Sequence, residues 1–327
     1  MYMNLGHGKL HWFKDVYYVD GIFYCKTLHK DCVVDVAYDS KVKIKMPIKW
    51  DGSLRAWKDL TFDDCETIES AFLHKRHITG GYSHIIGDEC IPIFYQLNKN
   101  NIKVNGIINC KNPNRHTPLE LKWPSILKTF TGIDVLPPKN YFIKNLYCGW
   151  QTNTWTARDT EFDFNSYAQT IINGLNIKDS HDPSKIVFEV RNSETRSILN
   201  MEEIKKSLKH LNIEYVSFAD MPYDRQIEKV YNAGTFIAQH GAGLTNLIFM
   251  RPKSNVFELL PESFQSYNGY RMFANMFKIN YRAYIEEEKN TLISGAANQS
   301  QKSKDRDRDL IINIQKFRDQ LDYELLI

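Results

Sequence analysis

The chain has 327 residues, of which 43% are hydrophobic and 25% are charged, so its composition is that of a folded globular protein and excludes a disordered, collagen-like or membrane-bundle chain. Its 42 Lys and Arg residues barely outnumber its 39 Asp and Glu residues, and a net charge of +3 gives no nucleic-acid footprint. Because the length exceeds what one hydrophobic core usually fills, we expect two domains with a cleft between them.

The N-terminal half predicts an α/β domain with an N-terminal β extension. Its pattern indicates hairpin-like strands between 15 and 48, a helix at about 83 to 97, and strands with the sequences VNGIIN and YFIKNLY. All six cysteines lie in this half, and none forms a C-x-x-C pair. We expect free, mostly buried thiols, with disulfides or a metal site as the alternative.

The C-terminal half predicts a parallel, doubly wound sheet from about 185 to 285. Short β-branched or aromatic runs alternate there with helical stretches at the spacing of βαβ units. The expected strands are KIVFEV, IEYVSF, TFIAQ, NVFELL and a run near 280 to 285. The expected helices are NMEEIKKSLKHL, MPYDRQIEKVYNAG, LTNLIFM and a run around 266 to 277.

Helix punctuation supports two of these helices. Asn200 and Glu203 have the spacing of a capping box, and Pro222 and Gly234 stand near the start and just past the end of the following helix. The polar residues 286 to 304 predict a mobile surface loop. Residues 305 to 322 then predict an amphipathic helix, because apolar side chains recur at helical spacing.

The segment TFIAQHGAGLTNLIFMRPKSNVFELLP is the most informative part of the chain. A strand that ends in a glycine-containing turn and opens a helix presents unpaired amides and the positive end of the helix dipole, which suit phosphate. Gly241 and Gly243 would let the backbone approach a ligand closely, and Ala242 adds little bulk. His240 is a candidate hydrogen-bond donor to a diphosphate oxygen. An ordinary strand-to-helix turn, held by a structural histidine, is the alternative.

This turn, HGAGLTN, followed by an apolar strand with a glutamate, resembles the signature of glycosyltransferase family 61. The segment VFEVRNSETRSILNMEEI is similar to the family's strand, arginine loop and R-x-I-x-N-E helix entry, with Met201 where an acidic residue is commoner. The segment GGYSHIIGDECIPIFYQL resembles the family's H-x-x-x-D helix in its first domain. The three motifs occur in the family's order.

The resemblance implies a GT-B architecture, in which two Rossmann-like domains face each other across a cleft. It places an acceptor-side domain at residues 1–160, a nucleotide-sugar domain at 161–304, and a helix at 305–327 that packs back on the domains. It further implies an inverting mechanism, a UDP-sugar as donor substrate, and no metal or other cofactor.

The same resemblance implies which residues hold the donor. They are His240, Gly241, Ala242, Gly243, Leu244, Thr245 and Asn246 of the turn, together with Arg191, Arg196 and Glu258. The arginines would bind the diphosphate, since their planar forks suit phosphate oxygens. Glu258 would bind ribose or sugar hydroxyls. Solvated loop charges for the arginines and a structural salt bridge for Glu258 are the alternatives.

Inverting transfer is a single displacement that needs a base for the acceptor hydroxyl. His84 and Asp88 lie four residues apart on the predicted helix and so face the same way. Asp88 is the first candidate for the base, while His84 could be the base itself, orient the aspartate or touch the donor. The structural alternative is that Asp88 and Glu89 are exposed acids that complement the helix dipole.

The sequence therefore predicts transfer of a sugar, with xylose or N-acetylglucosamine as the leading candidates, to a hydroxyl of a glycan or glycoprotein. A catalytically inactive nucleotide-sugar-binding module and a nucleotide-sugar epimerase are the alternatives. No G-x-G-x-x-G or P-loop is present, and His74 and His77 match no zinc spacing. We expect no nucleic-acid partner and no membrane span. Because the first residues lack the order of a signal peptide, a cytoplasmic bacterial or virus-encoded protein fits.

Overall fold

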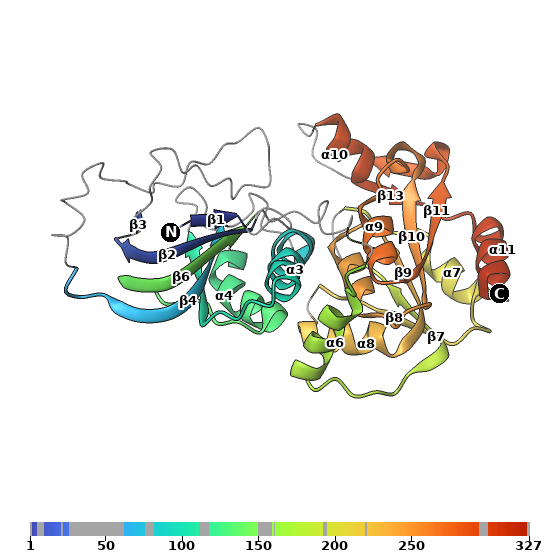
Figure 1. Cartoon of the computed structure of the whole chain (residues 1–327). Helices are drawn as coiled ribbons and strands as arrows, with labels where there is room; N and C mark the ends of the chain where they lie inside the picture. Colours follow the sequence, from blue (N-terminus) through green and yellow to red (C-terminus); the bar gives the residue numbers. More distant parts are fainter. Residues whose placement is uncertain are drawn as a thin grey trace. The chain divides into compact units, whose positions relative to one another are not determined.

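The computed structural model describes residues 2–4, 10–20, 22–25, 62–75, 82–110, 118–149, 159, 161–191, 195–219, 221–293 and 300–325. The chain divides into two compact units, Met1–Phe162 and Asp163–Ile327 (Figure 1). Each unit carries its own sheet and its own hydrophobic core. The α/β class expected from the sequence is thereby confirmed.

The sheet of the first unit is mixed, in the order β1-β2-β6-β4-β5, with β3 paired to β2. Its strands are β1 (Tyr2–Asn4), β2 (Leu10–Val19), β3 (Ile22–Cys25), β4 (Glu66–Lys75), β5 (Gly106–Cys110) and β6 (Tyr141–Gly149). Strand β4 runs parallel to both β5 and β6, whereas β2 pairs antiparallel with β6. The N-terminal strands thus extend a small parallel α/β core along one edge.

The sequence patterns missed β4 and the helix α4 (Pro118–Thr131). Much of the predicted hairpin region, 26–61, lies outside the described residues. Of the cysteines, Cys90 and Cys148 are buried free thiols and Cys65 is a partly exposed one, as expected. The side chains of Cys25, Cys32 and Cys110 lie outside the described part.

The predicted helix at 83 to 97 is confirmed and has an unpredicted feature. It begins with α2 (Tyr82–His84), continues as the π-helical segment η1 (Ile85–Cys90) and ends as α3 (Ile91–Lys99). A π-helical turn inside an α-helix is rare and occurs often at functional sites. Here it carries Asp88 of the H-x-x-x-D motif and the neighbouring Glu89.

The second unit has the predicted parallel sheet, in the order β11-β10-β9-β7-β8. The strands are β7 (Asp182–Glu189), β8 (Ile213–Val216), β9 (Ala233–Gln239), β10 (Asn255–Pro261) and β11 (Asn280–Glu286). Counted along the chain this is the order 2-1-3-4-5 of a doubly wound fold, whose strand order reverses between β7 and β9. Ligands of such sheets bind beyond the carboxyl ends of the strands at that point.

Helices cover both faces of this sheet (Figure 1). One core cluster joins α7 (Met201–Ser207) and α11 (Ile314–Leu325) to the strands, through residues such as Ile204, Phe188 and Phe317. The other face carries α6 (Asn165–Gly174), α8 (Tyr223–Tyr231), α9 (Gly269–Met276) and η2 (Ala242–Phe249). Among the described helices, none combines the length and the apolar character needed to cross a bilayer.

Two expectations about helix ends were wrong. The Asn200 side chain makes no capping bond; its amide donates to the Ile312 carbonyl (2.8 Å) and its oxygen accepts from the Ile312 amide (2.9 Å). Gly234 does not end a helix but lies inside β9, where a Cβ would collide with the Pro183 carbonyl oxygen. Both residues serve tertiary contacts that local sequence spacing cannot reveal.

The predicted loop at 286 to 304 and the helix start at 305 were also wrong. Residues Glu288–Asn290 form the turn η4, Thr291–Ile293 form β12, and Gln301–Arg306 form α10. Strand β12 pairs antiparallel with β13 (Arg308–Leu310), and the last helix begins only at Ile314. Residues 294–299 lie outside the described part. The segment around β13 is tied to the sheet, because the Gln239 side chain donates to the Arg308 carbonyl (3.0 Å).

Candidate functional site

The predicted donor residues of the second unit gather where the strand order reverses. Strand β7 ends at Glu189 and is followed by Arg191 and Arg196, while β9 ends at Gln239 and is followed by the turn from His240 to Gly243. Both connections leave the carboxyl edge of the sheet, which is the edge at which doubly wound folds bind their ligands. The structure thus brings the two predicted motifs together.

The turn is built so that its amides are available. The His240 carbonyl accepts from Arg196 Nη1 (3.2 Å), and the Gly241 carbonyl accepts from the Tyr270 hydroxyl (2.6 Å). In a trans peptide the N–H points away from the C=O, so the amides of Gly241 and Ala242 point away from these two donors. The first amides of the helix η2 also lack carbonyl partners within the helix. Such an array of N–H groups suits an anion.

Side chains pack closely against the two glycines of the turn. A Cβ on Gly241 would collide with Arg191 Nη1 and would stand 3.4 Å from Arg196 Nη1. A Cβ on Gly243 would collide with the Glu189 carboxylate. The sequence motif predicted close approach to a ligand, and the structure shows that both guanidinium groups and a carboxyl group already approach this closely.

The last residues of the motif have buried side chains. Leu244, Thr245 and Asn246 are completely buried, and the Asn246 amide donates to the Gln226 side chain (2.9 Å). Gln226 in turn donates to backbone carbonyls of the β8–α8 connection, including that of Phe218 (3.0 Å). The Asn246 side chain thus ties the turn to the β8–α8 connection, whereas the buried Thr245 Oγ1 has no hydrogen-bond partner among the described residues. Direct donor contact by them stays a prediction that this geometry does not favour.

Glu258 lies beneath His240 and is fully buried. One carboxylate oxygen pairs with His240 Nδ1 (2.5 Å), and the other accepts from the Tyr281 hydroxyl (2.5 Å). Burial, followed by the charge of Glu258, raises the pKa of Tyr281, so Tyr281 remains a donor. This arrangement favours the structural alternative for Glu258. It holds the imidazole in one orientation and leaves Nε2 as the atom that can meet a ligand.

Three aromatic rings surround the His240 imidazole, and sequence reasoning singled out none of them. The ring centroids of Phe264, Tyr267 and Tyr270 lie 4.9, 4.8 and 5.3 Å from that of His240. Tyr267 is 39% exposed and stacks on Phe264. An exposed ring beside this turn is suited to stack on a planar or apolar ligand face.

The arginines share a charged cluster with the C-terminal segment. Arg196 Nε lies 3.3 Å from Asp307 Oδ1, and Arg306 pairs with the same carboxylate (2.8 Å). The bond from Arg306 is the main reason that the pKa of Asp307 is lowered. Burial, and then the charge of Arg191, lowers the pKa of Arg196. Two guanidinium groups that repel each other on one side of a turn are stabilised by an added anion.

Arg196 also has an unusual backbone conformation. Its φ of 60° lies in the left-handed region, which costs a residue with a Cβ on the order of 1 to 3 kcal/mol. The contacts of its guanidinium group with the His240 carbonyl and Asp307 offset that cost. The conformation directs the side chain toward the turn.

Glu189 is a buried carboxyl group that the sequence motifs did not indicate. It is 6% exposed, and burial raises its pKa from 4.5 to about 7, although the charges of Arg191 and Arg196 act in the opposite direction. The strand run KIVFEV gave no signal for it beyond one charge in an apolar strand. Its place at the end of β7 puts it within the cluster of predicted donor residues.

Glu189→Gln is expected to raise the free energy of unfolding of the second unit, relative to wild type, by more at pH 8 than at pH 4. A pKa that rises from 4.5 to about 7 on folding means that the native state holds the extra proton, so wild-type stability is lost as pH rises through that window. The loss amounts to about 3 kcal/mol, and glutamine removes it. Urea unfolding at both pH values measures this; equal effects of the variant at pH 4 and 8 would contradict the assignment.

In the first unit, the predicted catalytic pair is in contact. His84 Nδ1 lies 2.6 Å from Asp88 Oδ2; the His84 side chain is 44% exposed and that of Asp88 only 4%. Glu89 is also buried and pairs with His74 Nε2 (3.1 Å). The alternative that Asp88 and Glu89 are exposed acids of a first helical turn is therefore wrong. A buried aspartate that holds an exposed imidazole is the arrangement of a base and its orienting group.

A family model described as Glycosyltransferase 61 matches residues 11–257, a range that contains the first two motifs and the HGAGLTN turn and ends one residue before Glu258. The chain belongs to glycosyltransferase family 61. EGF domain-specific O-linked N-acetylglucosamine transferase of Pan troglodytes is 33% identical over 104 residues, 29% of this chain and 20% of that protein. The enzyme of the same name from Drosophila melanogaster is 26% identical over 130 residues, 38% of this chain and 25% of that protein. The chain thus spans a fifth to a quarter of the relatives' length.

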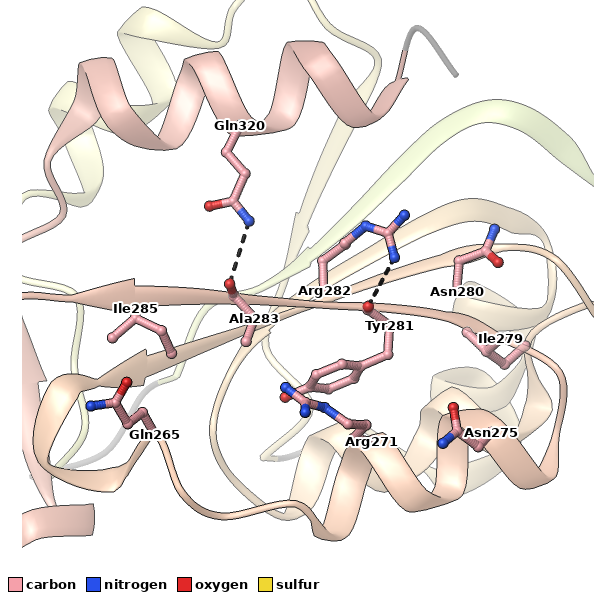
Figure 2. Close-up of a pocket in the computed structure, with 10 residues that line it drawn as sticks. All are labelled: Gln265, Arg271, Asn275, Ile279, Asn280, Tyr281, Arg282, Ala283, Ile285 and Gln320. Atoms are coloured by element: carbon pink, nitrogen blue, oxygen red, sulfur yellow. Dashed lines mark hydrogen bonds between the residues drawn. The ribbon is translucent and has the colours of Figure 1, made fainter.

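This family 61 chain has a pocket of about 640 Å³ at the outer edge of β11 (Figure 2). Figure 2 shows Arg271 beside the Tyr281 ring, and Gln320 and Arg282 donating to outward carbonyls of β11. None of the predicted donor residues lines this pocket. Tyr281 links it to the site, since its hydroxyl binds Glu258. Within the described ranges, no three His, Cys, Asp or Glu side chains gather as a metal would require.

Proposed function

We propose that this family 61 chain is an inverting glycosyltransferase that transfers a sugar from a UDP-sugar without a catalytic metal. The observation that carries the proposal is the turn from His240 to Gly243 at the reversal of strand order, with Arg191 and Arg196 against it. A leaving nucleoside diphosphate gains negative charge in the transition state, which fixed amides and guanidinium groups stabilise. The proposed architecture is GT-B, with the first unit as the acceptor side.

The proposed base is His84, held by Asp88. The exposed imidazole is the group that an acceptor hydroxyl can reach, and the buried carboxylate fixes the ring through Nδ1, so we assign uptake of the proton to Nε2. The sequence pattern favours Asp88 as the first candidate and leaves His84 as the alternative. We favour the reverse assignment because Asp88 is enclosed by protein.

The proposed acceptor is a hydroxyl of a glycoprotein or glycan, and the proposed sugar is N-acetylglucosamine, with xylose as the other candidate. The names of the relatives support N-acetylglucosamine and a protein acceptor. N-acetylglucosamine carries an acetamido group and a hydroxymethyl group that xylose lacks, and contacts in the pocket discriminate between such groups, so the sugar is open to direct test.

Incubation with a panel of UDP-sugars tests the proposed function. We expect calorimetry to show UDP binding, and mass analysis to show slow hydrolysis of one donor even without an acceptor. An inactive binding module would bind UDP but leave every donor intact, and an epimerase would convert the nucleotide sugar without releasing UDP. No binding of UDP or any UDP-sugar would overturn the proposal.

His240→Ala is expected to raise the Kd for UDP by about 10- to 150-fold, since it removes a hydrogen bond to a charged group worth about 1.5 to 3 kcal/mol. Tyr281→Phe is the matched control, because it leaves the imidazole in place and removes only one bond to Glu258. We expect a smaller change for it by calorimetry. Equal affinities of wild type and His240→Ala would remove His240 from the site.

A further inference from the structure

Glu189 is a buried carboxyl group of this cluster with no role in the proposed transfer. Its carboxyl group lies at the carboxyl end of β7, 6% exposed, against the backbone of Gly243. Among the described residues, its Oε2 atom has no hydrogen-bond partner. A buried polar atom without a partner is costly and calls for one. It is aimed at the turn that we propose binds the diphosphate.

The surroundings of Glu189 contain few groups that would stabilise a negative charge on its carboxyl group. Its register neighbours on β8 and β9 are Val216 and Ala238, which are uncharged. The charged groups that act on it are Arg191 and Arg196 from the connection after β7. These two guanidinium groups also interact with Asp307, so they are not dedicated to Glu189.

A diphosphate changes this balance because its oxygens only accept hydrogen bonds. An ionised carboxylate beside it would be repelled, whereas a neutral carboxyl group has one O–H to donate. The bound phosphates would also offset the two guanidinium charges that favour the ionised form. A hydroxyl of ribose or sugar would do the opposite, since it donates to a carboxylate.

We propose that Glu189 binds the donor's diphosphate as a neutral carboxylic acid, so that donor binding takes up a proton. The inference rests on the proposed function and names a binding residue and a linked proton for that same site. The proton comes from solvent and remains on the Glu189 carboxyl group while its O–H donates to a phosphate oxygen; no covalent step is involved. Because burial keeps the pKa of the free group near 7, uptake occurs in the neutral range.

Calorimetry with UDP-N-acetylglucosamine tests this, since a diphosphate esterified at both ends has no group that titrates near pH 7. Titrations at pH 8 in two buffers that differ in protonation enthalpy should show uptake of up to about one proton, and the Kd should rise by up to about tenfold per pH unit above pH 7. Glu189→Gln, a neutral isostere that still donates, should bind without uptake and with a Kd independent of pH in this range.

His240→Gln provides the second variant, because His240 is another group that could take up a proton. Uptake should persist in His240→Gln and vanish in Glu189→Gln. Wild-type binding without uptake, or uptake that persists in Glu189→Gln or is lost in His240→Gln, would overturn the inference and leave the proposed function standing. Absence of wild-type binding to UDP and to every UDP-sugar would overturn both.

Discussion

His84→Ala is expected to lower kcat by about 100- to 10,000-fold, the usual contribution of general base catalysis. The acceptor hydroxyl is a poor nucleophile until its proton is taken, and the exposed imidazole is the group of the His84–Asp88 pair that can take it. The Kd for UDP should stay unchanged, because the residues proposed to bind the diphosphate belong to the other unit. Initial rates at saturating donor and acceptor measure the loss.

Asp88→Asn distinguishes the two assignments of the base. If Asp88 positions His84, an asparagine can donate to Nδ1 and select the wrong tautomer, so the rate falls, and the double variant falls little further than His84→Ala alone. Added imidazole should partly restore His84→Ala but not Asp88→Asn. A near-normal rate for His84→Ala together with inactive Asp88→Asn would show that the aspartate itself is the base.

Arg196→Ala is expected to raise the Kd for UDP by about 10- to 150-fold. This corresponds to the loss of one hydrogen bond between charged groups, which is worth about 1.5 to 3 kcal/mol. The double variant with Arg191→Ala should lose still more, because both guanidinium groups lie against the Gly241 backbone. Calorimetry with UDP measures both.

Two controls separate charge from conformation in that experiment. Arg196→Gly removes the same guanidinium group but relieves the left-handed backbone, so it should fold at least as stably as Arg196→Ala and bind UDP as poorly. Arg318→Ala removes an exposed arginine of α11 that pairs with Asp322, and should change nothing. A normal Kd in Arg196→Gly would show that the guanidinium group does not contact the diphosphate.

The sheet of the second unit could be predicted because its strands are short, β-branched or aromatic runs separated by helices of regular spacing. The same signal was weaker in the first unit, where β4 contains charged residues such as Glu69 among its apolar ones. The prediction for the C-terminal segment was wrong for a different reason. Polar residues near 288–293 and 301–306 form elements that are held by tertiary contacts, such as those of β12 with β13.

The predicted site was partly recoverable for similar reasons. Glycines and histidine in the turn after β9 carried a local signal, and so did the spacing of His84 and Asp88. Glu189, Asp307 and Tyr267 did not, because their roles arise only when three chain segments meet at one edge of the sheet. The partner of Glu258 was equally hidden, since His240 stands 18 residues away in sequence.

A crystal structure of the protein with bound UDP tests the central claim most directly. We predict that the diphosphate lies on the amides of Gly241 and Ala242, in contact with Arg191 and Arg196. Density for the nucleotide in the pocket at the edge of β11, or anywhere away from the turn, would contradict the account.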